Sequence, residues 1–276
     1  DYVDGLCQKW NFDVCVANYV WFSKVLDVLP DSTQKVIDTH DVFGDRHIVA
    51  KEAGLEPVWF YTTKELEAYA LDRADLVLAI QDEEKAYFEG ITNKRVEVMG
   101  YVVPFQPLVL QKHNKVVIGY IGSGNPFNVE SLRVFQQEVM AKPELMQQFT
   151  FLLGGTVCKA FNEMNEIFDI VGLVDDLDDF YRQIDIAINP MVGGTGLKIK
   201  SLEALSYGKA LLATEDAMVG IDGTDAFHNF DSVPAMVDAL TSLSQERLEV
   251  LHGHSIETFQ SYNERFINEF KSLFAE

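Results

Sequence analysis

Short runs of apolar, β-branched residues alternate with stretches of helical periodicity along most of this chain, and that alternation limits the possible folds more than any other feature. Strands that alternate with helices form parallel sheets with helices on both faces. The predicted strands are 13–17, 35–38, 76–80, 95–99, 116–121, 149–153, 168–171, 186–189 and 210–214. The predicted helices are 3–10, 22–29, 63–72, 82–88, 129–140 with Asn128 as N-cap, 177–183, 197–207, 233–243 and 256–274. We therefore predict an α/β fold.

The alternation breaks near Pro104 and Pro107, which precede a polar stretch at 111–114. Paired prolines followed by polar residues are typical of a linker between domains. We expect one domain over residues 1–106, a second over 107–253, and a closing helical segment over 254–276. The first part offers about four strands where a doubly wound sheet usually has about six, so we expect that domain to be incomplete.

Charge and cysteine content exclude several classes of partner. The net charge is −21, which repels nucleic acid and anionic lipid, so a phosphate site here would depend on backbone N–H groups and a few placed cations. The three cysteines form no C-x-x-C pair, which favours a reducing cytoplasm. The chain has no run of eighteen apolar residues, and we expect no integral membrane segment.

A glycine-rich turn follows the predicted strand 116–121. Gly122, Ser123, Gly124 and Asn125 lead into a helix, and such a turn lets the backbone and the helix N-terminus approach a phosphate. No Lys follows the glycines as in a Walker A loop, and no acidic strand end lies at the distance that NAD binding requires. An ordinary tight turn remains the alternative.

A second glycine-rich turn follows the strand 186–189 and is less ordinary. Two lysines at its helix start oppose the helix dipole, which is easier to explain if an anion binds there. A glutamate one turn further could accept hydrogen bonds from ribose hydroxyls. The alternative is a helix with solvated lysines and a surface glutamate. The residues of this constellation are Gly193, Gly194, Thr195, Gly196, Leu197, Lys198, Lys200 and Glu203.

Together these segments resemble the donor site of glycosyltransferase family 4 and its close relatives. The resemblance covers nearly all of residues 113–225 and extends weakly to 74–84. It implies the GT-B fold, with two facing Rossmann-like, doubly wound domains. Residues 1–106 would then form a partial acceptor-side domain, residues 107–253 would bind the nucleotide sugar, and the helix in 254–276 would pack back on the first domain.

The resemblance also assigns roles within the donor site. Glu203 matches the second of two family glutamates and would hold the ribose, and the first falls on Thr195. Ser123 and Asn128 stand where many members have an Arg and a Lys that hold the diphosphate, so Lys198 or Lys200, preferably Lys200, would substitute. Gly172 lies in a turn that resembles the base-binding loop.

Two further polar groups follow predicted strands. His40 and Asp41 resemble the acceptor-side residues of the family and would act as the catalytic pair from the first domain, with His exchanging a proton. A helix N-cap and a surface histidine are the alternative. The acidic run 175–179 contains Asp-x-Asp, but four carboxylates suit a helix start without a metal, and we expect no metal site.

The resemblance implies a metal-independent glycosyltransferase of hexosyltransferase type. It would move a sugar from a nucleotide diphosphate sugar, UDP- or GDP-linked, to a hydroxyl of a glycan, lipid-linked or other acceptor, with retention, in glycan or polysaccharide biosynthesis. No other cofactor is expected, and the location would be cytoplasmic or peripheral at the inner membrane face. A non-catalytic sugar-nucleotide-binding or assembly subunit and a nucleotide-sugar epimerase remain alternatives.

Overall fold

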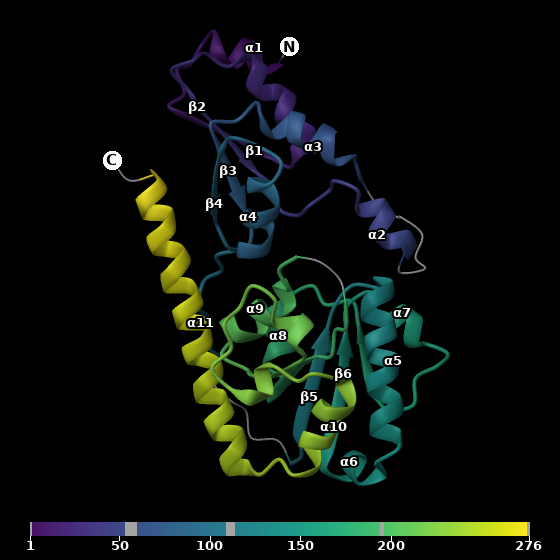
Figure 1. Ribbon diagram of the computed structural model, residues 1–276. Helices are drawn as coiled ribbons and strands as arrows, with labels where there is room; N and C mark the ends of the chain where they lie inside the picture. Colours follow the sequence, from purple (N-terminus) through teal and green to yellow (C-terminus); the bar gives the residue numbers. More distant parts are fainter. Residues whose placement is uncertain (1, 53–59, 109–113, 194–195, 275–276) are drawn as a thin grey trace. The chain divides into compact units, whose positions relative to one another are not determined.

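The computed structural model describes residues 2–52, 60–108, 114–193 and 196–274 of the chain (Figure 1). The chain forms two compact units, of which the first comprises residues 1–101 with 269–276 and the second comprises 102–268. Each unit has its own parallel sheet.

The first unit contains a four-stranded parallel sheet in the order β1-β2-β3-β4. One face packs against a core that includes Leu26, Leu71 and Phe88. The other face, at Leu76 and its neighbours, is contacted by the end of the helix α11 (Gln245–Phe274). The elements are α1 (Tyr2–Cys7), β1 (Val14–Asn18), the 3-10 helix η1 (Val20–Val28), β2 (Gln34–Asp38), α2 (Arg46–Glu52), α3 (Lys64–Leu71), β3 (Leu76–Ala79), α4 (Asp82–Glu89) and β4 (Arg95–Val98).

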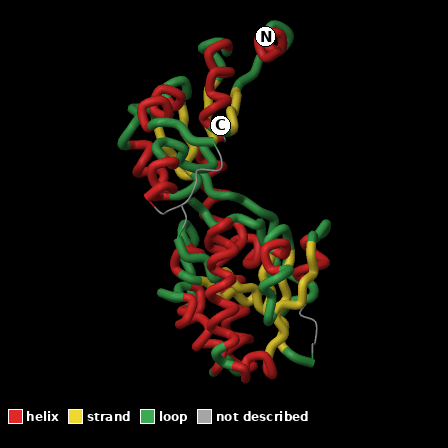
Figure 2. The backbone as a smooth tube through the Cα atoms, turned by 90° about the vertical axis from the view of Figure 1, so that its right-hand side faces the viewer, coloured by secondary structure: helices red, strands yellow, loops and turns green. Residues whose placement is uncertain are grey.

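The second unit contains a five-stranded parallel sheet in the order β7-β6-β5-β8-β9, whose strands lie among helices in Figure 2. Its strands are β5 (Val116–Ile121), β6 (Phe149–Gly154), β7 (Phe168–Gly172), β8 (Ile186–Asn189) and β9 (Ala210–Ala213). Its helices are α5 (Pro126–Met140), α6 (Pro143–Gln148), α7 (Cys158–Phe161), α8 (Leu177–Tyr181), α9 (Ile199–Ser206), η2 (Glu215–Met218), η3 (Ala226–His228), α10 (Val233–Thr241) and α11 (Gln245–Phe274).

The strands β8 and β9 of this second sheet are buried on both faces, which explains why they are continuous apolar runs. Alternate residues such as Ile118, Phe151 and Leu212 belong to one core. On the opposite face, a Cβ at Gly119 would lie 2.4 Å from Cγ2 of Ile184, so glycine is needed for the segment after α8 to pack there.

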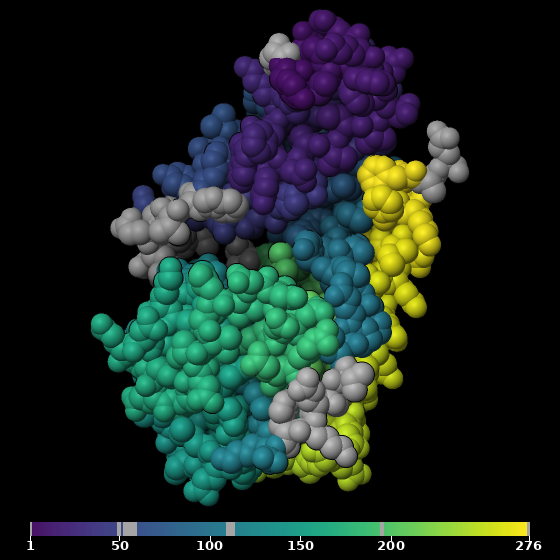
Figure 3. All heavy atoms as spheres, turned by 180° about the vertical axis from the view of Figure 1, so that it is seen from behind, coloured from purple at the N-terminus to yellow at the C-terminus, as the bar shows by residue number. Residues whose placement is uncertain are grey.

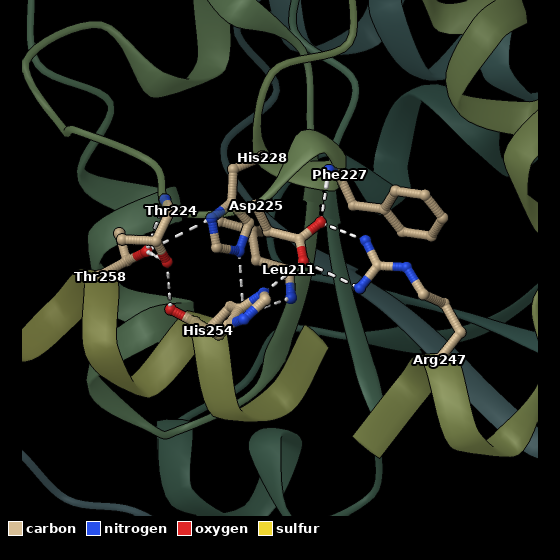
Figure 4. A network of polar contacts seen from close by, with 9 residues as sticks. Leu211, Thr224, Asp225, Phe227, His228, Arg247, His254 and Thr258 are labelled. Atoms are coloured by element: carbon tan, nitrogen blue, oxygen red, sulfur yellow. Dashed lines mark hydrogen bonds and ion pairs between the residues drawn. The ribbon is translucent and has the colours of Figure 1, made fainter. Parts of the chain in front are cut away.

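A polar network fixes the segment around η3 to α11 within the second unit (Figure 4). The Asp225 carboxylate is 3% exposed, forms an ion pair with Arg247 and lies 2.6 Å from Nδ1 of His254. Buried His228 places Nε2 3.1 Å from Oγ of Ser255, which in turn accepts the N–H of Leu211. These contacts hold α11 against the edge strand β9.

The segment 102–108, where the sequence predicts a linker, packs along the second unit. Phe105 stacks on Phe259 of α11 with ring centroids 5.3 Å apart, and the N–H of Gln106 donates to the carbonyl of Ser206. In Figure 3 this blue segment lies beside the yellow helix. The side of α11 that faces it is therefore covered.

Several predicted helices differ from the structure. The predicted helix 22–29 corresponds to the 3-10 helix Val20–Val28, and the predicted helix 197–207 begins only at Ile199. The last helix begins at Gln245, eleven residues before the predicted start, because buried Leu248 and Leu251 continue its apolar face through Gly253. Within the described ranges, no helix combines the length and the apolar character that a membrane span requires.

Candidate functional site

The strand order of the second unit reverses between β5 and β8. The chain moves from β5 outward to β6 and β7 and then returns to the other side of β5 at β8. Ligands of open parallel sheets bind at such a switch point, outside the carboxyl ends of the strands. The two glycine-rich turns follow β5 and β8, so both belong to this edge of the sheet.

The turn after β5 is held by internal hydrogen bonds. The N–H of Gly122 donates to the carbonyl of Gly154 over 3.1 Å, and the N–H of Gly124 donates to Oγ1 of Thr156 over 3.0 Å. These two N–H groups, which the sequence favoured for phosphate binding, are therefore engaged by neighbouring turns. The internal bonds fix the path of the turn.

The predicted N-cap of the following helix is wrong. Asn125, not Asn128, caps α5, because Pro126 occupies the first helical position and the Asn125 carboxamide accepts the N–H of Phe127 over 2.9 Å. Asn128 is buried and donates from Nδ2 to the carbonyl and hydroxyl oxygens of Ser123, at 2.9 and 3.2 Å. Asn128 thus ties the turn to its helix.

The turn after β8 is fixed to its neighbours at Val192 and Gly193. Gly193 has φ of 76° and its N–H donates to Oδ2 of Asp216 over 2.7 Å. The N–H of Val192 donates to Oγ of Ser131 on α5 over 3.1 Å. A Cβ at Gly193 would lie 3.5 Å from the ring of Phe127, so the two glycine-rich turns are neighbours in space.

Two predicted residues of this turn, Gly194 and Thr195, lie outside the described residues. Gly196 has φ of 76°, a conformation that favours glycine, and half-buried Leu197 directly precedes the cap of α9. The predicted donor-binding roles of Gly194 and Thr195 therefore stay predictions.

The two lysines have different surroundings. Lys198 occupies the N-cap position of α9, is buried, and donates from Nζ to the carbonyl of Gly196 over 2.6 Å. Lys200, on the first turn of α9, is half-buried, and burial together with the charge of Lys198 lowers the pKa of its ammonium. A cation in these surroundings is stabilised by a bound anion.

Glu203 is held from one side by a buried tyrosine. The Tyr181 hydroxyl at the end of α8 donates to Oε1 of Glu203 over 2.9 Å. Burial raises the pKa of the Glu203 carboxyl, whereas the bond from Tyr181 and the charge of Lys200 lower it. The Tyr181 ring stacks on Tyr207 at 4.3 Å, and the Tyr207 hydroxyl donates to Asp178 over 2.9 Å.

A buried polar contact fixes the start of α9. Nδ2 of Asn189, the last residue of β8, donates to Oγ of Ser201 over 2.8 Å, and that hydroxyl donates to the carbonyl of Ala217 over 2.6 Å. The helix that carries Lys200 and Glu203 is therefore anchored to the end of β8 and to η2.

Sequence reasoning missed Tyr181, Ser201 and Asp216 as residues of this site. The signal available for Tyr181 was a hydroxyl on an otherwise apolar helix face, and no local pattern marks the other two.

Gly172 is the last residue of β7, and the acidic run 175–179 follows it at the start of α8. Gly172 has φ of 83° and its carbonyl accepts the N–H of Gly155 over 2.7 Å. Asp176 caps α8 by accepting the N–H of Asp178 over 2.9 Å, which is the helix-start role expected for this run. In the described part of the chain, no group of three or more His, Cys, Asp or Glu residues has the arrangement of a metal site.

The predicted catalytic residues lie in the first unit, after β2. His40 has φ of 60°, and its Nε2 lies 2.9 Å from Oδ1 of Asn18 and 3.3 Å from Oδ2 of Asp38. Asp41 instead accepts a bond from Nη1 of Arg46 over 2.6 Å, so Asp38 and Asn18, not Asp41, orient the imidazole. Backbone strain of this kind is common at functional sites.

The His40 side chain is one-third exposed and lies against Tyr19, another residue with positive φ, with ring centroids 4.4 Å apart. Burial raises the pKa of the Asp38 carboxyl, and His40 lowers it. A partly exposed imidazole beside a carboxylate is equipped to accept a proton and to be stabilised once charged.

Comparisons with known proteins are consistent with these features. Residues 115–246 match the family model described as Glycosyl transferases group 1. No curated protein matches the sequence. Among solved structures, Staphylococcus aureus TarM has a TM-score of 0.71 at 13% identity, with 99% of this chain and 58% of TarM covered.

Two further structures have similar scores. Anabaena HepE in complex with UDP and glucose has a TM-score of 0.69 at 13% identity, with 98% of this chain and 81% of HepE covered. The pneumococcal O-GlcNAc transferase GtfA in complex with UDP and GlcNAc has a TM-score of 0.69 at 13% identity, with 99% of this chain and 59% of GtfA covered. The chain thus spans less than two thirds of TarM and of GtfA. It has the GT-B fold of glycosyltransferases, and its second unit carries the match to group 1 of these enzymes.

Proposed function

We propose that the chain transfers a sugar from a nucleotide diphosphate sugar to an acceptor hydroxyl, with retention of anomeric configuration, in glycan or polysaccharide biosynthesis. One observation carries the proposal. Two glycine-rich turns lie at the switch point of the second sheet, beside a helix that presents half-buried Lys200 and Glu203.

The diphosphate would be held mainly at the two helix starts. The α5 N-terminus, capped by Asn125 and opened by Pro126, directs its dipole toward the turn after β5. Because Gly122 and Gly124 already donate within the protein, we assign the contact to Ser123 and Asn125, together with the ammonium of Lys200. A cation of lowered pKa gains stability when the leaving phosphate develops charge.

Glu203 would accept hydrogen bonds from the ribose hydroxyls. It lies one turn beyond Lys200 on the same helix, so ribose and diphosphate could be bound by one rigid element. The base would contact the turn at Gly172, a half-buried residue with positive φ. The donor would be UDP- or GDP-linked, and HepE and GtfA were both crystallised with UDP.

His40 and Asp41 would serve the acceptor side. His40, oriented by Asn18 and Asp38, is equipped for proton exchange, and Asp41 with Arg46 would supply a fixed charge pair near it. The enzyme would be a metal-independent transferase of hexosyltransferase type related to family 4. The acceptor would be a glycan, a lipid-linked sugar or another hydroxyl, and the reaction would take place in the cytoplasm or at the inner membrane face.

Two other functions use the same donor site. A nucleotide-sugar epimerase would convert the donor with no acceptor present, and a non-catalytic binding or assembly subunit would bind the donor without turnover. The strained, partly exposed His40 favours a catalytic role over simple binding, because residues in such backbone conformations cluster at active sites.

Product analysis with a panel of UDP- and GDP-sugars separates the three functions. The protein is incubated with each donor and with mixed glycan or lipid-linked acceptors, and nucleotide release and sugar products are followed. The proposal expects nucleotide diphosphate release coupled to a new glycosidic product. Epimerised donor without transfer would indicate the epimerase, and binding with no turnover would indicate the binding subunit.

A further inference from the structure

We propose that Tyr181 is a positioning residue that makes the donor site selective for ribose over deoxyribose nucleotides. It would do so by fixing one oxygen of Glu203 and leaving the other to the sugar hydroxyls. The inference rests on the proposed function, because Glu203 acts there as the ribose ligand.

The hydrogen bond joins two elements that are distant in sequence. Tyr181 ends α8, and Glu203 lies in the middle of α9, and the Tyr181 hydroxyl donates to Oε1 over 2.9 Å. Tyr181 is 2% exposed, whereas Glu203 is half-buried, so the tyrosine contacts the carboxylate from the protein interior. The outer part of the carboxylate is then the part open to a ligand.

The direction of the bond is fixed by the two groups. Burial and the adjacent charge of Glu203 raise the pKa of the Tyr181 phenol well above its ordinary value, so the hydroxyl keeps its proton and donates. Within the described ranges, Oε1 is the oxygen of Glu203 that receives a hydrogen bond. A carboxylate has about four acceptor positions, which leaves Oε2 for a ribose diol.

The tyrosine is itself held in place. Its ring stacks on Tyr207 with an interplanar angle of 16° and contacts Phe180 edge-on. The Tyr181 ring is therefore fixed in position. The Glu203 carboxylate must adopt the rotamer that meets the hydroxyl, so the side-chain entropy of Glu203 is lost before the nucleotide binds.

A simpler role for the hydrogen bond between Tyr181 and Glu203 would be to stabilise the fold. In that case the Tyr181→Phe variant would lose thermal stability, and its selectivity between ribose and deoxyribose would match the wild type. Tyr207→Phe is the matched control, because it removes a hydroxyl from the stacked neighbour without touching Glu203.

The test is calorimetric titration of the full chain with UDP and GDP and with their 2′-deoxy and 3′-deoxy counterparts. We expect the wild type to prefer at least one ribonucleotide by about 10-fold or more, and Tyr181→Phe to lower that preference by about 3- to 10-fold with little change in deoxynucleotide affinity. Tyr207→Phe should keep the preference. In a Glu203→Ala background, Tyr181→Phe should have no further effect on it.

Two results would overturn the inference and are distinguishable. If Glu203→Ala abolishes the preference but Tyr181→Phe leaves it intact, Tyr181 is structural only and the proposed function stands. If the wild type binds neither UDP nor GDP, the proposed function itself fails. A thermal melt of each variant shows whether it is folded, and the Glu203→Ala background keeps the comparison decisive if Tyr181→Phe is less stable.

Discussion

The carboxylate of Asp216 accepts the backbone N–H of Gly193 over 2.7 Å, and this bond couples the turn after β8 to the 3-10 helix after β9. Two strand ends are thus joined beside the helix start that carries Lys200. The turn that we assign to the donor has its path set by a residue more than twenty positions away.

The first prediction concerns that bond. Asp216→Ala should weaken donor binding by about 3- to 10-fold and lower the free energy of unfolding by about 1–2 kcal/mol, because the Gly193 N–H loses its acceptor. Glu215→Ala is the control, since Glu215 is an exposed neighbour on the same 3-10 helix. Titration calorimetry and urea unfolding provide the two readouts. Equal behaviour of the two variants would contradict the positioning role of Asp216.

The second prediction compares two glycines. Gly155 has φ of 90°, and an added Cβ would lie 2.3 Å from the carbonyl oxygen of Gly122, so Gly155→Ala should destabilise by more than about 2 kcal/mol. Gly253 lies inside α11 with nothing within 4 Å of an added Cβ, so Gly253→Ala should stabilise by about 0.5–1 kcal/mol. Far-ultraviolet circular dichroism during urea unfolding measures both. A Gly155→Ala variant as stable as the wild type would be inconsistent with the close approach of the two turns.

The third prediction concerns pH. Burial lowers the pKa of His228 to about 4, and the partners Arg247 and His254 hold the pKa of Asp225 below its ordinary value. Both groups bind protons more readily in the unfolded chain, so stability should fall as the pH drops. For His228 the loss runs from about pH 6.5 to 4 and reaches about 3 kcal/mol.

The His228 contribution can be measured from the pH dependence of unfolding in the wild type and in His228→Gln. All three tryptophans, Trp10, Trp21 and Trp59, precede residue 102, so circular dichroism or hydrogen exchange, and not tryptophan fluorescence, must follow the second unit. We expect a shallower acid slope in His228→Gln than in the wild type. An identical slope in the two proteins would show that His228 is not the titrating group.

The fourth prediction separates donor binding from transfer. His40→Ala should lower the transfer rate about 100-fold or more, because it removes the proposed proton acceptor, and should change donor affinity by less than about 2-fold. All the residues we assign to the donor lie in the second unit, whereas His40 lies in the first. Steady-state transfer kinetics and donor titration give the two values. A large loss of donor affinity in His40→Ala would mean that this histidine binds the donor.

Much of the second sheet could be predicted because several of its strands are largely buried. Ile186–Asn189 and Val116–Ile121 are the predicted ranges without change, since a strand of this kind is a continuous apolar run bounded by polar residues. Helix starts were less predictable. Asn125 and Asn128 both suit an N-cap, and only the geometry of Pro126 at the first helical position decides between them.

The residues of the candidate site also divide into those that the sequence could predict and those that it could not. Glycine turns and the Lys200–Glu203 spacing are local and visible in the sequence, whereas the partners that orient them are not. Tyr181 meets Glu203, and Asn18 meets His40, across 22 residues each, and such contacts arise only when the sheet is assembled. Positive φ at His40 was also unpredictable, because no turn residue marks it.

The central claim is that the second unit binds a nucleotide sugar with Glu203 on the ribose. The most direct test is calorimetric titration of the wild type, Glu203→Ala and the exposed-site control Glu163→Ala with UDP-sugars and GDP-sugars. We predict saturable binding of at least one donor to the wild type, equal binding to the control, and a loss of about 1–3 kcal/mol in Glu203→Ala. Binding of equal strength to all three proteins would contradict the ribose assignment, and no binding of any donor to the wild type would contradict the claim itself.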